Sequence, residues 1–200
     1  KERMRHYIDT VRPDYHKPDN FDDLVVELHA SKTRFYTGLM REARIPLRPG
    51  VARLLQEARE QGLRLAIATT TTPANVSALL ASTLGEDGES WFEVIGAGDV
   101  VPAKKPASDI YDYVLQQLNL PASACLAFED SENGILSSRG ADLKTIITVN
   151  GYTQNHDFSG ALTVLDNLGE PDQPATVIAG AAINGNTYID VAMLNRLHTC

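Results

Sequence analysis

The fold of this 200-residue chain is decided by residues 128–134, which read FEDSENG. They place two adjacent carboxylates, Glu129 and Asp130, after a short apolar run and just before a helix start. In open α/β sheets, ligands collect at the carboxyl ends of strands, where helix N-termini present free backbone amides. Two neighbouring acids repel each other unless a cation lies between them, and Mg²⁺ prefers oxygen ligands. The stretch therefore predicts a metal site, and a plain helix cap by Asp130 or Ser131 is the alternative.

Helix and strand patterns alternate on both sides of this stretch. We expect helices over residues 51–61, 73–82, 109–118, 131–139 and 191–197, and strands over 64–68, 94–97, 125–128, 144–149, 162–165 and 176–178. Alternating units of this kind predict an α/β fold, with a mostly parallel sheet covered by helices on both faces.

The first part of the chain has a different pattern. Apolar residues recur at helical spacing through residues 1–43, with an interruption near Pro18. Residues 45–50 then read IPLRPG, and two prolines and a glycine are typical of a short, stiff connection. We therefore predict a helical unit over 1–45, a hinge linker over 46–50 and an α/β core domain over 51–200.

Composition excludes several classes of protein. The formal net charge of −8 argues against a nucleic-acid or anionic-membrane partner, because both are bound mainly through excess Lys and Arg. The apolar runs are too short to span a bilayer, and the two cysteines, Cys125 and Cys200, give neither a disulfide framework nor a zinc spacing. We expect a soluble, cytoplasmic protein, with Cys125 inside the strand over 125–128.

A second chemical position follows the strand over residues 64–68. Thr69, Thr70, Thr71 and Thr72 precede Pro73, so hydroxyls and backbone amides gather where a strand passes into a helix. Such a turn can hold a phosphate, although four threonines also suit plain helix capping. Thr69 differs from the others by its place at the very end of the strand.

Lys105 is the third chemical position. It lies in the loop after the strand over residues 94–97, so its ammonium can reach the same edge of the sheet. Loop lysines are usually solvated, and that reading stays open for the residue taken alone. Three neighbouring loops would then offer a hydroxyl, an ammonium and a pair of carboxylates.

Together these segments resemble a known family. Thr69 after LAIA (65–68), then KPASDIY (105–111) and FEDSENGI (128–135), are similar to the second, third and fourth motifs of the haloacid dehalogenase superfamily. The likeness is to its beta-phosphoglucomutase-like branch and, within that, to CbbY-like sugar-phosphate phosphatases. It implies a Rossmann-like core and a partial α-helical cap over residues 1–45.

The resemblance also implies roles for residues. Thr69 would bind the transferring phosphoryl group, with Thr70 and Thr71 beside it, and Lys105 would neutralise its charge. Asp130 would ligate Mg²⁺, directly or through water, with Glu129 close by. In the cap, Arg3 and Lys1 match a loop that meets the far end of a phosphosugar, and helix-start charges exposed to water are the alternative for both.

One motif of the family is missing from the 200 residues. Its nucleophile is an aspartate in the pattern apolar strand, Asp, any residue, Asp, Gly, which the sequence does not contain. Family order places this strand before the cap and in the middle of the sheet, so we expect the 200 residues alone to be inactive and poorly folded.

Three functions follow from this reading. The first is Mg²⁺-dependent hydrolysis of a phosphorylated sugar, with a sugar bisphosphate as one option, through an aspartyl-phosphate supplied by the missing motif. A phosphosugar mutase with the same core is the second, and a non-catalytic phosphate-binding or regulatory protein is the third. At full length we expect a monomer.

Overall fold

The computed structural model describes residues 1–42, 45–181 and 186–199, and its contacts divide the chain into two compact units, Lys1–Ile45 and Pro46–Cys200. Each unit is described by itself. No helix within the described residues is both long enough and apolar enough to cross a membrane.

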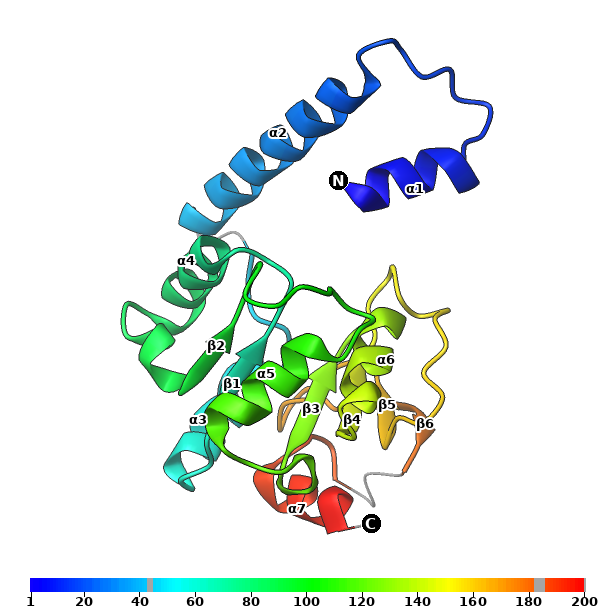
Figure 1. Cartoon of the computed structure of the whole chain (residues 1–200). Helices are drawn as coiled ribbons and strands as arrows, with labels where there is room; N and C mark the ends of the chain where they lie inside the picture. Colours follow the sequence, from blue (N-terminus) through cyan, green and yellow to red (C-terminus); the bar gives the residue numbers. More distant parts are fainter. Residues whose placement is uncertain (43–44, 182–185, 200) are drawn as a thin grey trace. The chain divides into compact units, whose positions relative to one another are not determined.

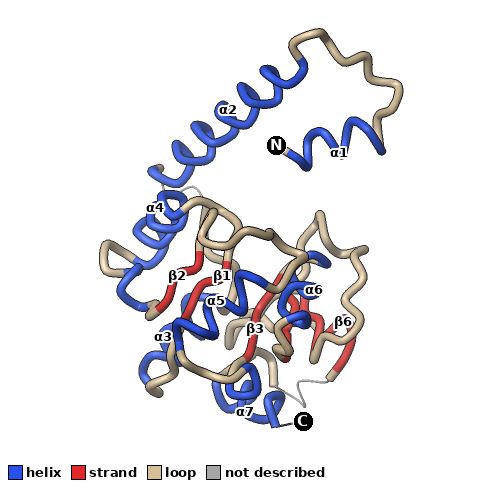
Figure 2. Tube along the Cα trace, viewed as in Figure 1, coloured by secondary structure: helices blue, strands red, loops and turns tan. Residues whose placement is uncertain are grey.

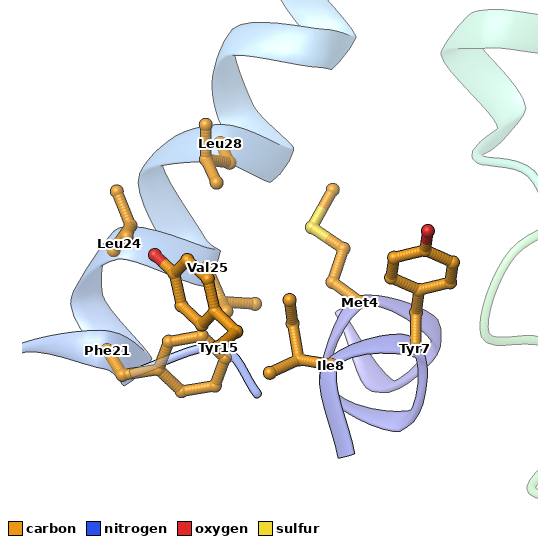
Figure 3. Close-up of a pocket in the computed structure, with 8 residues that line it drawn as sticks. All are labelled: Met4, Tyr7, Ile8, Tyr15, Phe21, Leu24, Val25 and Leu28. Atoms are coloured by element: carbon orange, nitrogen blue, oxygen red, sulfur yellow. The ribbon is translucent and has the colours of Figure 1, made fainter. Parts of the chain in front are cut away.

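The first unit consists of α1 (Glu2–Thr10) and α2 (Phe21–Arg41). Apolar side chains of both helices, with Tyr15 from the segment between them, surround a groove of about 490 Å³ (Figure 3), lined by Met4, Tyr7, Ile8, Tyr15, Phe21, Leu24, Val25 and Leu28. Val25 is buried, whereas Tyr7 and Leu28 are about half exposed. Two helices therefore share an apolar seam without fully covering it.

The second unit alternates helices and strands (Figures 1 and 2). In chain order its main elements are α3 (Val51–Glu60), β1 (Ala66–Ala68), α4 (Pro73–Leu84), β2 (Val94–Gly96), α5 (Asp109–Leu118), β3 (Leu126–Glu129), α6 (Glu132–Gly140), β4 (Lys144–Thr148), β5 (Thr163–Leu165), β6 (Val177–Gly180) and α7 (Val191–Thr199). Short 3₁₀ turns over Gly88–Trp91 and Ala122–Ala124 precede β2 and β3.

The strands form two separate sheets within the part of the chain that the structure describes. β1 pairs with β2 in parallel, and the second sheet has the order β3-β4-β5-β6. Its first three strands are parallel and β6 is antiparallel. β1 and β3 thus each have a hydrogen-bonded neighbour on one side only among the described strands.

Side chains alternate between the two faces of the strands, and each face is covered by helices. In β1 and β2, Ile67 and Ile95 pack with α4, whereas Gly96 faces α5, where a Cβ would come 2.9 Å from Val114 Cγ2. In β4, Ile146 packs among residues of α3 and α7, and its neighbour Ile147 packs against α6. Helices on both faces are what a near-continuous apolar run in a parallel strand requires.

The packing of α5 joins the two sheets. Ile110 and Tyr111, near its start, share one apolar cluster with Ala127 of β3 and Ala68 of β1. The edges of β1 and β3 therefore lie under the same helix, although they are not paired with each other.

The expected α/β class and mostly parallel strand arrangement are confirmed, with small differences. Cys125 was predicted inside a strand but precedes β3, because the 3₁₀ turn ends there, and Glu129 instead forms the last residue of β3. β1 starts two residues later than the predicted strand over 64–68. Ala43 and Cys200 lie outside the described residues.

Candidate active site

Lys105 joins the carboxyl ends of β1 and β3. Its Nζ donates to the carbonyl oxygen of Ala68, the last residue of β1, at 2.9 Å, and to Oε1 of Glu129, the last residue of β3. The side chains of Lys105 and Glu129 are only 14% and 8% exposed. An ammonium has three hydrogens, so these two acceptors leave one for a ligand.

The loop that carries Lys105 is held at both ends. Upstream, Ala103 N donates to Oδ1 of Asp109 at 3.3 Å, and downstream Ser137 Oγ donates to the carbonyl of Ala107 at 2.6 Å. Because Asp109 belongs to α5 and Ser137 to α6, both helices fix the backbone on either side of the lysine. The ammonium is thus placed by anchored backbone as well as by its own hydrogen bonds.

Tyr111 of α5 contacts both members of the ion pair. Its hydroxyl donates to the same Oε1 of Glu129, and its ring centroid lies 4.8 Å from Lys105 Nζ. Burial, followed by the charge of Glu129, its hydrogen bond and the charge of Asp130, raises the pKa of Tyr111 well above that of a free phenol. The hydroxyl therefore remains a hydrogen-bond donor throughout the physiological pH range.

The start of α6 shapes the other side of Glu129. Gly134 leaves room for the carboxylate, since a Cβ at this position would lie 2.0 Å from Glu129 Oε2. Ser131 is the N-cap of α6, and its hydroxyl accepts from Gly134 N at 3.2 Å. The N-cap expected at the strand end is thus made by Ser131, while Asp130 is left for other contacts.

Asp130 is exposed, and Asn150 orients it. Asn150 Nδ2 donates to Oδ2 of Asp130 at 3.2 Å, while Asn150 Oδ1 accepts from Tyr152 N at 2.8 Å. Because the second bond fixes which end of the amide carries the oxygen, the NH₂ group points at the carboxylate. Oδ1 of Asp130 remains available for a cation.

The threonine turn is held by β2, by α4 and by one hydrogen bond of its own. Thr69 N donates to the carbonyl of Gly96 at 2.8 Å, extending the pairing of β1 with β2, and Thr69 Oγ1 accepts from Thr71 N at 3.2 Å. Thr71 Oγ1 accepts from Asn75 of α4 at 3.2 Å. The hydroxyl hydrogen of Thr69 can still be donated to a ligand, whereas the Thr71 amide is engaged.

The predicted site residues fall into two groups. Thr69, Lys105, Glu129 and Asp130 lie together through the bonds of Lys105 to Ala68 and Glu129, with Thr70 and Thr71 in the adjoining turn. Lys1 and Arg3 belong to the other unit, where Lys1 is exposed and the side chain of Arg3 lies outside the described part of the structure.

Sequence reasoning gave no role to Tyr111, Gly134 or Asn150. Tyr111 and Gly134 lie inside the quoted motifs. A glycine one helical turn after Asp130 could have indicated that a side chain packs closely against the start of this helix. Asn150 lies 20 residues from Asp130, and only the turn after β4 brings the two together.

The donor set fits part of a Mg²⁺ site. Oδ1 of Asp130 is a hard oxygen ligand at the carboxyl end of a strand, and Glu129 Oε1 is shared by two donors. No group of three or more His, Cys, Asp or Glu side chains that could hold a metal occurs among the described residues. Further oxygen ligands would have to come from substrate, water or other parts of the protein.

An α/β core with a hydroxyl, a part-buried lysine and a carboxylate pair at adjoining strand ends defines a class of enzyme. The family model of haloacid dehalogenase-like hydrolases matches residues 3–142, more than half of the chain, and the chain belongs to this family.

Its relatives include CbbY proteins. The plasmid-borne CbbY of Cupriavidus necator is 43% identical over 99% of this chain and 77% of its own length. CbbY from Rhodobacter sphaeroides in complex with phosphate matches with a TM-score of 0.71 and 39% identity, over 83% of this chain and 72% of that one. A CbbY variant from the same organism, in complex with xylulose-(1,5)bisphosphate, matches with a TM-score of 0.68 and 43% identity, over 72% and 64%.

Proposed function

We propose that the full-length protein is a Mg²⁺-dependent phosphatase that hydrolyses a phosphorylated sugar through an aspartyl-phosphate. The observation that carries this proposal is the position of Lys105, whose ammonium bonds the ends of β1 and β3 next to Asp130. A cation, an ammonium and a hydroxyl donor around one point are what a transferring phosphoryl group requires, because its charge spreads over three oxygens.

Each residue has a part in this reaction. The hydroxyl of Thr69 would donate to one phosphoryl oxygen, and the remaining hydrogen of Lys105 to another. Asp130 would hold Mg²⁺ through Oδ1, with Glu129 close beside it, and the metal would neutralise charge on the phosphoryl group. Thr70 and Thr71 would border the phosphate from the turn after β1.

The nucleophile would come from a further strand. β1 and β3 each lack a partner on one side among the described strands, and α5 packs over both edges. A parallel strand between them would satisfy the backbone groups of both edges and would end beside Lys105. This arrangement supports an aspartate at that strand end, as the family resemblance implies.

The relatives support the substrate class. One structural relative is bound to xylulose-(1,5)bisphosphate, and a Thermotoga maritima relative, 30% identical over 66% of this chain, is named a phosphorylated carbohydrates phosphatase. For a bisphosphate, the family resemblance implies that Arg3 and Lys1 bind the second phosphate and that residues 46–50 are a hinge linker.

The test uses full-length protein, Mg²⁺ and a panel of sugar mono- and bisphosphates. We expect release of inorganic phosphate that chelation of Mg²⁺ abolishes. Isomerised phosphosugar without phosphate release would identify a mutase instead. Absence of both products, together with an upstream coding sequence that lacks the Asp, any residue, Asp, Gly pattern, would identify a non-catalytic protein.

A further inference from the structure

Both oxygens of the Glu129 carboxylate have close neighbours within the protein. Its Oε1 accepts from both Lys105 and Tyr111. Its Oε2 lies in the space that Gly134, at the start of α6, leaves by having no Cβ. The carboxylate therefore bonds Tyr111 of α5 through one oxygen, and its other oxygen lies next to Gly134 of α6. Any shift of this carboxylate would move the ammonium that is bonded to it.

Tyr111 is the part of this arrangement that belongs to neither the ion pair nor the proposed metal site. It is 8% exposed, packs in the cluster under α5 and contacts Lys105 with its ring and Glu129 with its hydroxyl. A rigid aromatic side chain on a helix can fix an ion pair better than a second flexible chain, because fewer rotamers remain open to it.

We propose that Tyr111 is a positioning residue that, through Glu129, fixes the Lys105 ammonium where the transition state of phosphoryl transfer needs it. The inference rests on the proposed function, because Lys105 must act on the phosphoryl group. Tyr111 itself touches no reacting atom. Its removal would leave substrate binding in place and weaken the binding of the transition state.

The first experiment compares Tyr111→Phe with wild type in the full-length enzyme. We expect kcat to fall about tenfold with KM within about twofold, the pattern of an interaction that matters only in the transition state. Orthovanadate, which mimics the five-coordinate phosphorus, should bind about tenfold more weakly, while inorganic phosphate should bind within about twofold of wild type. Tyr113→Phe removes a hydroxyl from the same helix and should change none of these.

A double-mutant cycle then tests the route through Glu129. In a Glu129→Gln background, Tyr111→Phe should lower kcat by no more than about twofold, because the two groups act as a unit. The same tenfold loss in both backgrounds would overturn the inference, as would an unchanged kcat in Tyr111→Phe. A large fall in unfolding temperature with equal weakening of vanadate and phosphate would show a structural role instead.

Glu129→Gln alone gives a second readout that does not depend on the folding of Tyr111→Phe. It should weaken vanadate more than phosphate, and equal weakening would contradict the inference. Lys105→Ala separates the two proposals. If it leaves turnover unchanged, the proposed function fails; if it lowers turnover while Tyr111→Phe does not, only the role of Tyr111 fails.

Discussion

The carboxyl ends of β1 and β3 meet at one site, but they are built differently. At the end of β3, the side chain of Glu129 is 8% exposed and lies against Lys105 from the loop before α5, Tyr111 of α5 and Gly134 of α6. At the end of β1, the hydroxyls of Thr69 and Thr71 are uncharged and accept one hydrogen bond each, from Thr71 N and from Asn75 of α4. The difference teaches that the charged half of the site is preformed, whereas the turn after β1 keeps a hydroxyl free for a ligand.

The exposed carboxylate of the β3 end should give the largest effect when it is changed. Asp130→Asn in the full-length protein should lower Mg²⁺-dependent phosphate release by about 10³-fold or more, since metal charge stabilisation amounts to several kcal/mol. Initial rates across a Mg²⁺ series measure this. Asp142→Asn makes the same charge change at an exposed position after α6 and should leave the rate intact. Full activity in Asp130→Asn would contradict the metal assignment.

Removing the lysine that joins the two strand ends should have the next largest effect. Lys105→Ala should lower kcat about 10²–10³-fold, because an oriented donor to the phosphoryl oxygens is lost. It should also destabilise the protein by about 3–5 kcal/mol in denaturant unfolding, since Glu129 is left as a buried charge without its cation.

Lys104→Ala is the matched control for this change. Lys104 bonds Gly98 and Asp99 with a side chain that is 41% exposed, so its loss should leave both kcat and stability nearly unchanged. If Lys105→Ala and Lys104→Ala change kcat and stability equally, Lys105 has no role beyond that of a surface lysine, and the site is not preformed around it.

The sequence predicted the elements of the fold better than the bonds of the site. Alternating patterns indicate strands that end at one edge, and this is enough to expect Thr69, Lys105 and Asp130 in adjoining loops. The choice of partner needs atomic distances: Lys105 bonds Glu129, while Asp130 is oriented by Asn150. Side-chain rotamers and loop closure decide such pairings, and neither leaves a periodic signal in sequence.

A smaller effect is expected at the β1 end. Thr69→Ala should lower kcat about 10–100-fold, which corresponds to one hydrogen bond to a charged group. Thr69→Ser keeps the hydroxyl and should retain most of the activity. Steady-state rates of the two variants at saturating substrate test this. If alanine and serine behave alike, the Thr69 hydroxyl serves only to accept from Thr71 N, and the β1 end takes no part in the chemistry.

The smallest effect should come from the side chain that orients the metal ligand. Asn150→Ala frees Oδ2 of Asp130, and loss of such an outer partner typically weakens metal affinity about tenfold. Calorimetric titration with Mg²⁺ measures this directly, and Asn155→Ala, in the same loop and exposed, is the control. Because Asn150 touches Asp130 and not Glu129, saturating Mg²⁺ should restore the rate of this variant but not that of Lys105→Ala. Failure of high Mg²⁺ to restore it would mean that Asn150 acts on more than the metal affinity of Asp130.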